Sequence, residues 1–205
     1  SATPLFIGYA QVYCMRLTYV GELGYELFVP AEQSVHVYDR LRAAGEPLGA
    51  RPVGLAALGS LRLEKGYRDY GHDVDNTDTV MEVGLGFTCD MDKPGGFIGK
   101  EAVVAQRTAG IPSRRLVQVL LQDPEPLLHH AEVLHRNDRP VGEVRAASYG
   151  HTLGGAIGLA MVEAGEPVNK QYITSGEWSV EVANQHVPAT VSLRPLYDPS
   201  NARIK

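Results

Sequence analysis

Residues 16–30 read RLTYVGELGYELFVP, and this stretch decides how the first part of the chain folds. Two runs rich in Val, Tyr, Leu and Phe flank the break GELG, which is the composition of two strands joined by a turn. If Tyr25, Leu27 and Val29 face the core, Glu26 faces the other way, because successive side chains of a strand alternate. We therefore predict a hairpin whose second strand carries a carboxylate on its non-core face.

The residue types leave three partners open for Glu26. In a dry space a carboxylate needs a partner with two parallel donors, because an unpaired buried charge costs several kcal/mol. An arginine is one such partner, and a pterin, with a ring N–H beside an amino group, is another. On residue types alone, solvent or an internal arginine is favoured over a ligand. The second acidic residue of the stretch, Glu22, is expected to be structural and to need only the turn to explain it.

Helices and strands alternate through the rest of the first half. Apolar residues at helical spacing and a following glycine predict helices over residues 31–45, 53–66 and 97–110. Residues 80–91, VMEVGLGFTCDM, have the composition of a strand. In the first two helices the spacing is set by Val35, Tyr38, Leu41, Leu55, Leu58 and Leu61.

The chain changes character after IPSRR at residues 111–115, which we interpret as a linker. Seven short β runs follow at regular spacing, among them RLVQVLL, PVGEVRAAS, QYITSG and ATVSLRP. They predict a small all-β barrel or sandwich over 113–195, with Asn137 and Asp138 in a hairpin turn. The fold class expected is α+β, with one domain over 1–110 and a second over 113–205.

Composition excludes several classes of protein. The chain has 205 residues, 44% of them hydrophobic, a formal net charge of -5 and no basic block longer than SRR at 113–115. Nucleic acid is therefore an improbable partner, and no apolar run reaches the ~18 residues of a membrane span. Cys14 and Cys89 lie far apart without a C-x-x-C motif, which favours two reduced thiols.

Other polar groups are better explained by structure than by chemistry. His129 and His130 are adjacent and lack a partner at metal-ligand spacing, so exposed loop histidines are expected and we predict no metal site. The segment GHDVDNTDT lacks the glycine and the closing glutamate of a calcium loop. Glu64 and Arg68 stand four residues apart, so they are placed to form a helix-end ion pair.

Two long motifs resemble one known family. RLTYVGELGYELFVP resembles the R-x-x-Y-T-G-E-x-G-Y-E hairpin of the glycine cleavage T-protein (aminomethyltransferase) family, whose members bind tetrahydrofolate. EKGYR, GHD and LGFTCDMDKPGGFIGKEA are similar to the folate-binding portion of sarcosine and dimethylglycine dehydrogenases, and PLYDPSNARIK resembles their close. The resemblance implies a partial T-protein-like α/β domain followed by the family's small C-terminal β-barrel domain.

The resemblance also implies site residues. The family's pterin-contacting tyrosine and glutamate fall on Tyr19 and Glu26, and Arg62 and Arg203 are the further cofactor-binding residues that it implies. A family substrate-site arginine is replaced by Leu58, which favours the dehydrogenase branch. The family's catalytic aspartate lies upstream of this hairpin, so no catalytic residue is expected within the chain.

The implied function is that of a tetrahydrofolate-binding, one-carbon-transfer portion of a flavin-dependent sarcosine or dimethylglycine dehydrogenase-like enzyme, giving 5,10-methylenetetrahydrofolate. FAD would belong to an upstream domain, and the chain is expected to be a C-terminal fragment that catalyses nothing by itself. One alternative is an aminomethyltransferase served by a lipoyl carrier protein. Another is a non-catalytic interaction module, as in a phosphatase regulatory subunit of this architecture. The expected location is a bacterial cytoplasm or a mitochondrial matrix.

Overall fold

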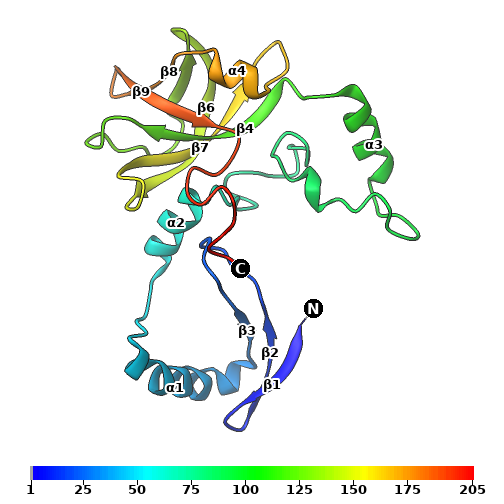
Figure 1. Ribbon diagram of the computed structural model, residues 1–205, viewed down its shortest axis with the longest axis vertical. Helices are drawn as coiled ribbons and strands as arrows, with labels where there is room; N and C mark the ends of the chain where they lie inside the picture. The colour runs from blue at the N-terminus through cyan, green and yellow to red at the C-terminus, as the bar shows by residue number, and fades with distance from the viewer. Residues whose placement is uncertain (1) are drawn as a thin grey trace.

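The computed structural model describes residues 2–205, and Figure 1 shows a small sheet with one helix beside it and a barrel above. The lower sheet has the order β1-β2-β3 and is antiparallel throughout. One of its faces packs against α1 (Ser34–Gly45), where Ala10, Val12 and Val37 form a buried cluster. The strands are β1 (Thr3–Ile7), β2 (Ala10–Met15) and β3 (Glu26–Phe28).

The predicted hairpin is present, but its connection is longer than the four residues GELG. β2 pairs with β3 as far as Met15 opposite Glu26, so residues 16–25 lie outside both strands. The Thr18 hydroxyl accepts the backbone N–H groups of Val20 and Gly21, at 3.3 and 3.2 Å. These bonds compete with strand pairing and turn the chain where Gly21 takes a φ of 78°.

All three predicted helices are confirmed, whereas the strand predicted over 80–91 is wrong. Thr79 and Glu82 exchange bonds, each side chain accepting the other's backbone N–H, which is the reciprocal pattern that starts a helical turn. Gly84, with a φ of 70°, then reverses the chain before any strand can form. The helices are α1, α2 (Leu55–Glu64) and α3 (Lys100–Ala109), and short 3-10 turns cover Ala31–Gln33, Glu46–Leu48 and Gly86–Thr88.

The second half is a closed six-stranded barrel, which confirms the predicted β architecture. The strand order is β4-β7-β6-β5-β8-β9, so every strand has two neighbours. Asn137 and Asp138 take φ values of 51° and 60° in the predicted hairpin turn. The strands are β4 (Arg114–Leu121), β5 (Val133–Arg136), β6 (Arg139–Gly150), β7 (Gly155–Glu163), β8 (Trp178–Val182) and β9 (Gln185–Ser192).

One β run of the prediction is a helix instead. QYITSG lies largely in α4 (Lys170–Thr174), because the Asn169 side chain accepts the Tyr172 backbone N–H at 2.9 Å and caps the helix start. Tyr172 then packs edge-on against Trp178 at 6.0 Å between ring centroids. The helix therefore packs its single aromatic side chain, Tyr172, against β8 of the barrel.

The C-terminal end of α2 joins the lower part to the barrel. The Gln118 amide donates to the Leu63 and Glu64 carbonyls at 2.6 and 2.9 Å, and its oxygen accepts the Leu196 N–H. The predicted ion pair between Glu64 and Arg68 is wrong. Buried Glu64 instead accepts the N–H groups of the β6–β7 turn at 2.8 Å, and Arg68 donates to the backbone carbonyls of residues 66 and 83.

Beyond β9 the chain leaves the barrel and returns to the hairpin (Figure 1). Arg16 donates to the Ile204 carbonyl at 3.0 Å, Tyr197 donates to Glu22, and Lys65 pairs with Asp198 at 3.0 Å. We call these six residues the tail junction. Glu22 is structural as expected, but the turn alone does not explain it, because its partner lies 175 residues away.

Asp198 is the charged centre of the tail junction. Burial alone would raise the pKa of its carboxyl, but the N–H groups of Arg203 and Ala202 and the Lys65 ammonium outweigh burial and lower the pKa to about 2. The predicted domains 1–110 and 113–205 stay a prediction, and the tail joins the two. No helix within residues 2–205 is both long and apolar enough to cross a membrane.

Candidate functional site

The sheet face opposite α1 is open and carries aromatic side chains around Glu26. Met15 stands opposite Glu26 and Tyr13 opposite Phe28, so these four side chains share one face. Phe6 of β1 continues that face, and Phe6, Tyr13 and Phe28 are 69%, 53% and 53% exposed. Exposed aromatic groups gathered on one face are typical of a binding surface. We call these five residues the open sheet face.

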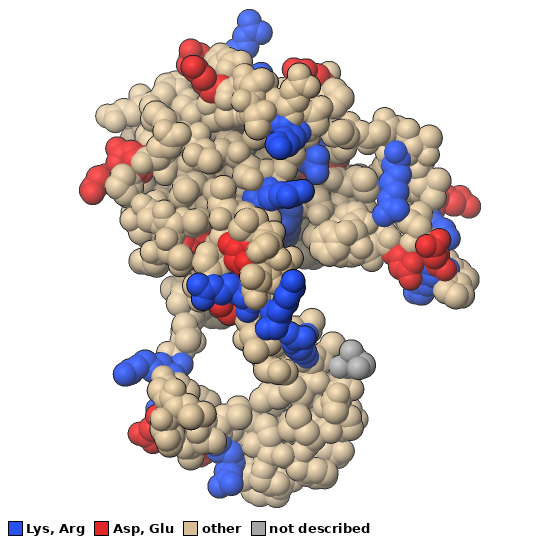
Figure 2. All heavy atoms as spheres, in the orientation of Figure 1, with Lys and Arg blue, Asp and Glu red and all other residues tan. Residues whose placement is uncertain are grey.

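Predicted strand orientation holds for most of β3. Leu27 and Val29 pack against the buried cluster under α1, and Glu26 and Phe28 face the other way. Tyr25 was expected in the core and is 62% exposed, because it precedes the strand in the irregular connection. Figure 2 shows an opening between this lower part and the barrel, which α1, residues 49–54 and β2–β3 border in Figure 1.

Glu26 is exposed and has no hydrogen-bond or ion-pair partner among residues 2–205. Three other acidic groups of this part of the chain are engaged. Glu64 binds two backbone N–H groups, Asp73 binds Arg62, and Asp78 binds two arginines at 2.7 Å each. Glu26 is therefore an acceptor that the described chain leaves available.

Tyr19 lies at the end of α2, fixed by two contacts. Its hydroxyl donates to the Arg68 carbonyl at 3.1 Å, and its ring lies parallel to the Tyr67 ring with centroids 6.3 Å apart. Burial raises the pKa of the Tyr19 phenol, and the nearby Arg62 guanidinium offsets part of that rise. At neutral pH Tyr19 is therefore a protonated donor whose oxygen still has an acceptor position.

Arg62 is almost fully buried and is committed to an ion pair. Its guanidinium binds the Asp73 carboxylate through both terminal nitrogens and also donates to the Tyr67 carbonyl at 3.1 Å. Asp73 in turn accepts the Asp69 N–H and contacts the His72 ring, each at 2.9 Å. A folate contact by Arg62 stays a prediction, and such a contact would have to use the guanidinium N–H groups that Asp73 and the Tyr67 carbonyl leave over.

Arg203, the fourth predicted site residue, is exposed near the end of the tail. Its backbone N–H donates to Asp198 at 3.1 Å, and its side chain makes no hydrogen bond within the described residues. The structure thus brings Tyr19 and Arg62 together and leaves Glu26 on the open sheet face. No bond links Glu26 to the other three in the part of the chain that the structure describes.

The aspartates of GHDVDNTDT do not gather around a common point. Asp73 holds Arg62, Asp75 accepts from Thr77 at 2.6 and 2.7 Å, and Asp78 holds Arg114 and Arg145. That this segment is not a calcium loop stays a prediction. His129 and His130 are exposed in the loop before β5, as expected.

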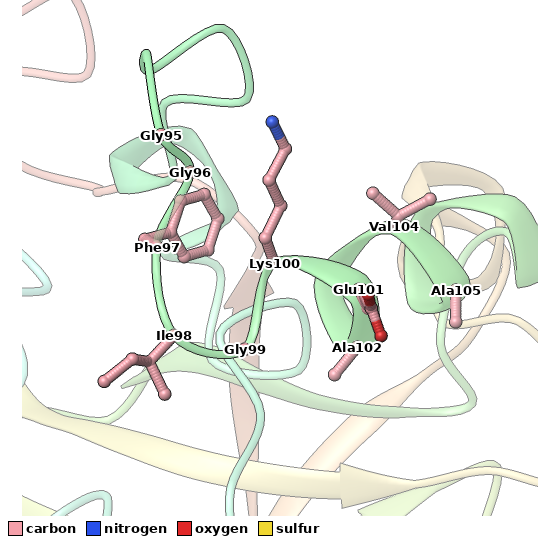
Figure 3. A pocket seen from close by; sticks show the side chains of 10 residues that line it. All are labelled: Gly95, Gly96, Phe97, Ile98, Gly99, Lys100, Glu101, Ala102, Val104 and Ala105. Atoms are coloured by element: carbon pink, nitrogen blue, oxygen red, sulfur yellow. The ribbon is translucent and has the colours of Figure 1, made fainter.

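A large open hollow of about 1090 Å³ is lined by residues of the segment 95–105. Figure 3 shows Phe97 turned into the bend of this loop, with Ile98 pointing to the opposite side. None of the four predicted site residues lines it. The hollow is therefore separate from the open sheet face.

The sequence did not predict the aromatic residues that share a face with Glu26. Phe6 and Tyr13 lie on strands paired with the hairpin, and their grouping with Phe28 depends on cross-strand register. The available signal was local: in residues 3–15 large apolar side chains occupy both alternating sets of positions, as in a strand with no water-facing side.

Comparisons with known proteins cover most of the chain. Residues 1–93 match the GCVT N-terminal domain family and residues 114–198 match the glycine cleavage T-protein C-terminal barrel domain family. A 4-methylaminobutanoate oxidase (formaldehyde-forming) of Paenarthrobacter nicotinovorans is 44% identical over 97% of this chain and 23% of its own length. Mitochondrial sarcosine dehydrogenase of Homo sapiens is 38% identical over 95% of this chain and 21% of its own.

A solved structure supports the same family relationship. A crystal structure of glycine cleavage system aminomethyltransferase T from Bartonella henselae superposes with a TM-score of 0.75 at 26% identity, covering 90% of this chain and 49% of that one. The chain thus spans between about a fifth and a half of the length of these relatives. Hairpin, barrel and both family matches agree, and the chain belongs to the glycine cleavage T-protein family.

Proposed function

We propose that this chain is the tetrahydrofolate-holding, one-carbon-transfer portion of a flavin-dependent enzyme that oxidises N-methyl amines and yields 5,10-methylenetetrahydrofolate. The observation that carries the proposal is Glu26, an exposed carboxylate without a partner among residues 2–205, set on a face with three exposed aromatic rings. Two similar proteins named an oxidase and a dehydrogenase of N-methyl amines support the choice of reaction.

The residues present fit a pterin in part. A carboxylate offers two acceptor oxygens that match a ring N–H and a neighbouring amino group, and such charge-assisted pairs are the strong hydrogen bonds. Tyr13 and Phe28, a directly opposed pair, offer flat apolar surface beside Glu26. Arg62 fits less well, because its two terminal nitrogens are already on Asp73.

The work of this chain is to bind and orient. Tetrahydrofolate supplies two nitrogens that accept a one-carbon unit. Glu26 fixes one edge of the pterin and so determines which edge faces the incoming carbon, which lowers the entropy cost of reaction. Tyr19 is a protonated phenol held in place by the Arg68 carbonyl and by stacking near Tyr67.

Titration of tetrahydrofolate into the intact protein tests this assignment. Glu26→Gln keeps the size of the side chain but removes its charge, so one charge-assisted pair worth about 1.5–3 kcal/mol weakens. We expect a 10- to 100-fold rise in Kd. The matched control is Glu32→Gln, an exposed glutamate before α1, which should bind as the unaltered protein does. Equal affinity in the Glu26 variant would refute the pterin role.

The aminomethyltransferase reading is the alternative that the fold comparison supports. In that case the one-carbon donor is a lipoyl-linked carrier protein, and the intact protein holds no flavin. Mixing the intact protein with sarcosine or 4-methylaminobutanoate under anaerobic conditions separates the two, because only an N-methyl amine oxidase bleaches a bound FAD. A non-catalytic regulatory module would show neither flavin bleaching nor folate-dependent turnover.

We further propose a bacterial cytoplasm or a mitochondrial matrix as the location. Both hold the reduced folate on which the proposed reaction depends. Both also keep thiols reduced, which agrees with the free state of Cys14 and Cys89.

A further inference from the structure

Three potential metal ligands lie close together on the outside of the barrel. None of them belongs to the open sheet face. His135 of β5, Glu181 of β8 and His186 of β9 each offer one donor atom, and these atoms all lie within 4.8 Å of one another. The three strands are consecutive in the barrel order. All three residues are therefore carried by one continuous hydrogen-bonded part of the barrel sheet.

Strand register explains why these side chains share a face. Glu181 is directly opposite His186, and His135 is directly opposite Ser179, two residues before Glu181. Their neighbours along each strand, Leu134, Val180 and Val187, fill the barrel core, so the three ligands point outward. A register shift between Leu134 and His135 in the pairing with β6 further re-aims the imidazole.

His135 has an unmet need for a partner. It is only 8% exposed, yet neither of its ring nitrogens has a hydrogen-bond partner among the described residues. Its Nε2 lies 3.3 Å from a Glu181 oxygen, but without the alignment of a hydrogen bond. Buried imidazole nitrogens are normally satisfied, so a ligand that binds both His135 and Glu181 would satisfy this buried ring.

We propose that His135, Glu181 and His186 bind one divalent transition-metal ion of the Zn²⁺ class, with the fourth position open to water. Two imidazoles and one carboxylate are a donor set that Zn²⁺ favours, with three protein ligands and an open site. Co²⁺, Ni²⁺ and Cu²⁺ suit the same nitrogen-rich set. The site is independent of the proposed folate function.

The geometry needs only a small adjustment to hold an ion. Tetrahedral Zn²⁺ with bonds of about 2.0–2.2 Å places its donor atoms ~3.3 Å apart, which is the present spacing of His135 and Glu181. His186 is exposed, so its ring can rotate inward, and its Nδ1 is 3.3 Å from the Ser179 hydroxyl. A hydroxyl on one ring nitrogen orients the other for a metal.

The surroundings of His135, Glu181 and His186 favour the binding of a cation. His186 and Ser179 line a hollow of about 480 Å³, so water has access to the exposed histidine. Asp138 and Glu177 line the same hollow and add negative charge. The neighbouring cation, Arg136, is held 4.1 Å over the Tyr172 ring by a cation–π contact and does not compete for the carboxylate of Glu181.

Metal uptake by the intact protein tests the site. After chelation and dialysis, calorimetric titration with Zn²⁺ should show one more equivalent for the unaltered protein than for His186→Ala. Co²⁺ in that equivalent should give the intense visible absorption of four- or five-coordinate cobalt. Because loss of a group that only orients a ligand costs 10- to 100-fold in affinity, loss of the ligand itself should cost more than about 10-fold.

Variants and a matched control make the test decisive. Glu181→Gln should behave as His186→Ala does, and both residues are exposed enough to be changed without loss of folding, whereas His135 is buried. His130→Ala removes an exposed histidine in the nearby loop and should keep the equivalent. If the unaltered protein and His186→Ala bind the same amount of Zn²⁺, the site is refuted, and His135 and Glu181 only contact each other.

Discussion

The ion pair between Arg62 and Asp73 should be the most costly polar contact to break in this protein. Their side chains are 7% and 0% exposed, and Asp73 satisfies both Arg62 nitrogens, the Asp69 N–H and the His72 ring. Asp73→Asn keeps the shape of the side chain and one acceptor oxygen but leaves the guanidinium charged and buried. Breaking such a pair from one side costs about 3–5 kcal/mol.

Urea unfolding measures this cost. The chain has a single tryptophan, Trp178 of β8, whose fluorescence reports unfolding of the barrel. Leu63, next to Arg62, packs in one cluster with barrel residues, so loss of the ion pair should destabilise the barrel as well. With a denaturant dependence of roughly 2 kcal/mol per M, the midpoint for Asp73→Asn should fall by about 1.5–2.5 M. Asp69→Asn, an exposed neighbour, is the control and should stay within about 0.5 kcal/mol.

A paired replacement separates the ion pair from simple loss of packing. Replacing both partners by apolar side chains removes the unpaired charge, so Arg62→Met with Asp73→Leu should be more stable than Asp73→Asn alone. The reasoning is refuted if Asp73→Asn lies within about 1 kcal/mol of the unaltered protein. It is also refuted if the double replacement is no more stable than the single one. Folate affinity of the double variant then shows whether Arg62 has any second role as a ligand contact.

The tail junction yields three further predictions. The folded structure lowers the pKa of Asp198 to about 2. The contribution of Asp198 to stability is therefore fully present above its unfolded pKa near 4 and is lost as pH falls from about 4 to 2. Proteolysis of the tail across that pH range checks this, and release of the tail already at pH 6 would contradict it. Gly21→Ala should destabilise by about 1–2 kcal/mol from its φ of 78°, and by more because a Cβ there meets the Lys65 side chain at 2.7 Å. Gly49→Ala has the same φ with open space around it, so thermal unfolding should show the smaller loss, and equal losses would exclude the Lys65 contact. Tyr197→Phe removes one tertiary hydrogen bond and should cost about 1 kcal/mol in the same unfolding experiment, with no change pointing to a tail that is free in solution.

Local sequence patterns determine most of the elements. Apolar spacing and a terminal glycine placed the three helices of the first half, and regular β runs placed the barrel, because these signals act within a few residues. Asn137 and Asp138 specified their turn for the same reason. The failures were also local competitions: side-chain bonds at Thr79 and Asn169 started helical turns where composition favoured strands.

The candidate sites depend on contacts that no local pattern encodes. Sequence alternation was enough to turn Glu26 away from the core, but its aromatic neighbours came from strand register across the sheet. The partners of Glu22, Lys65 and Gln118 lie 175, 133 and 78 residues distant in sequence. The three proposed metal ligands likewise needed the pairing of β5 with β8, two strands that are not consecutive in the chain. Sequence by itself determined most of the elements and the family they belong to, since periodicity and motif are short-range. Only the tertiary structure decided which charges are already paired and which remain free to bind, since pairing depends on distances between segments far apart along the chain.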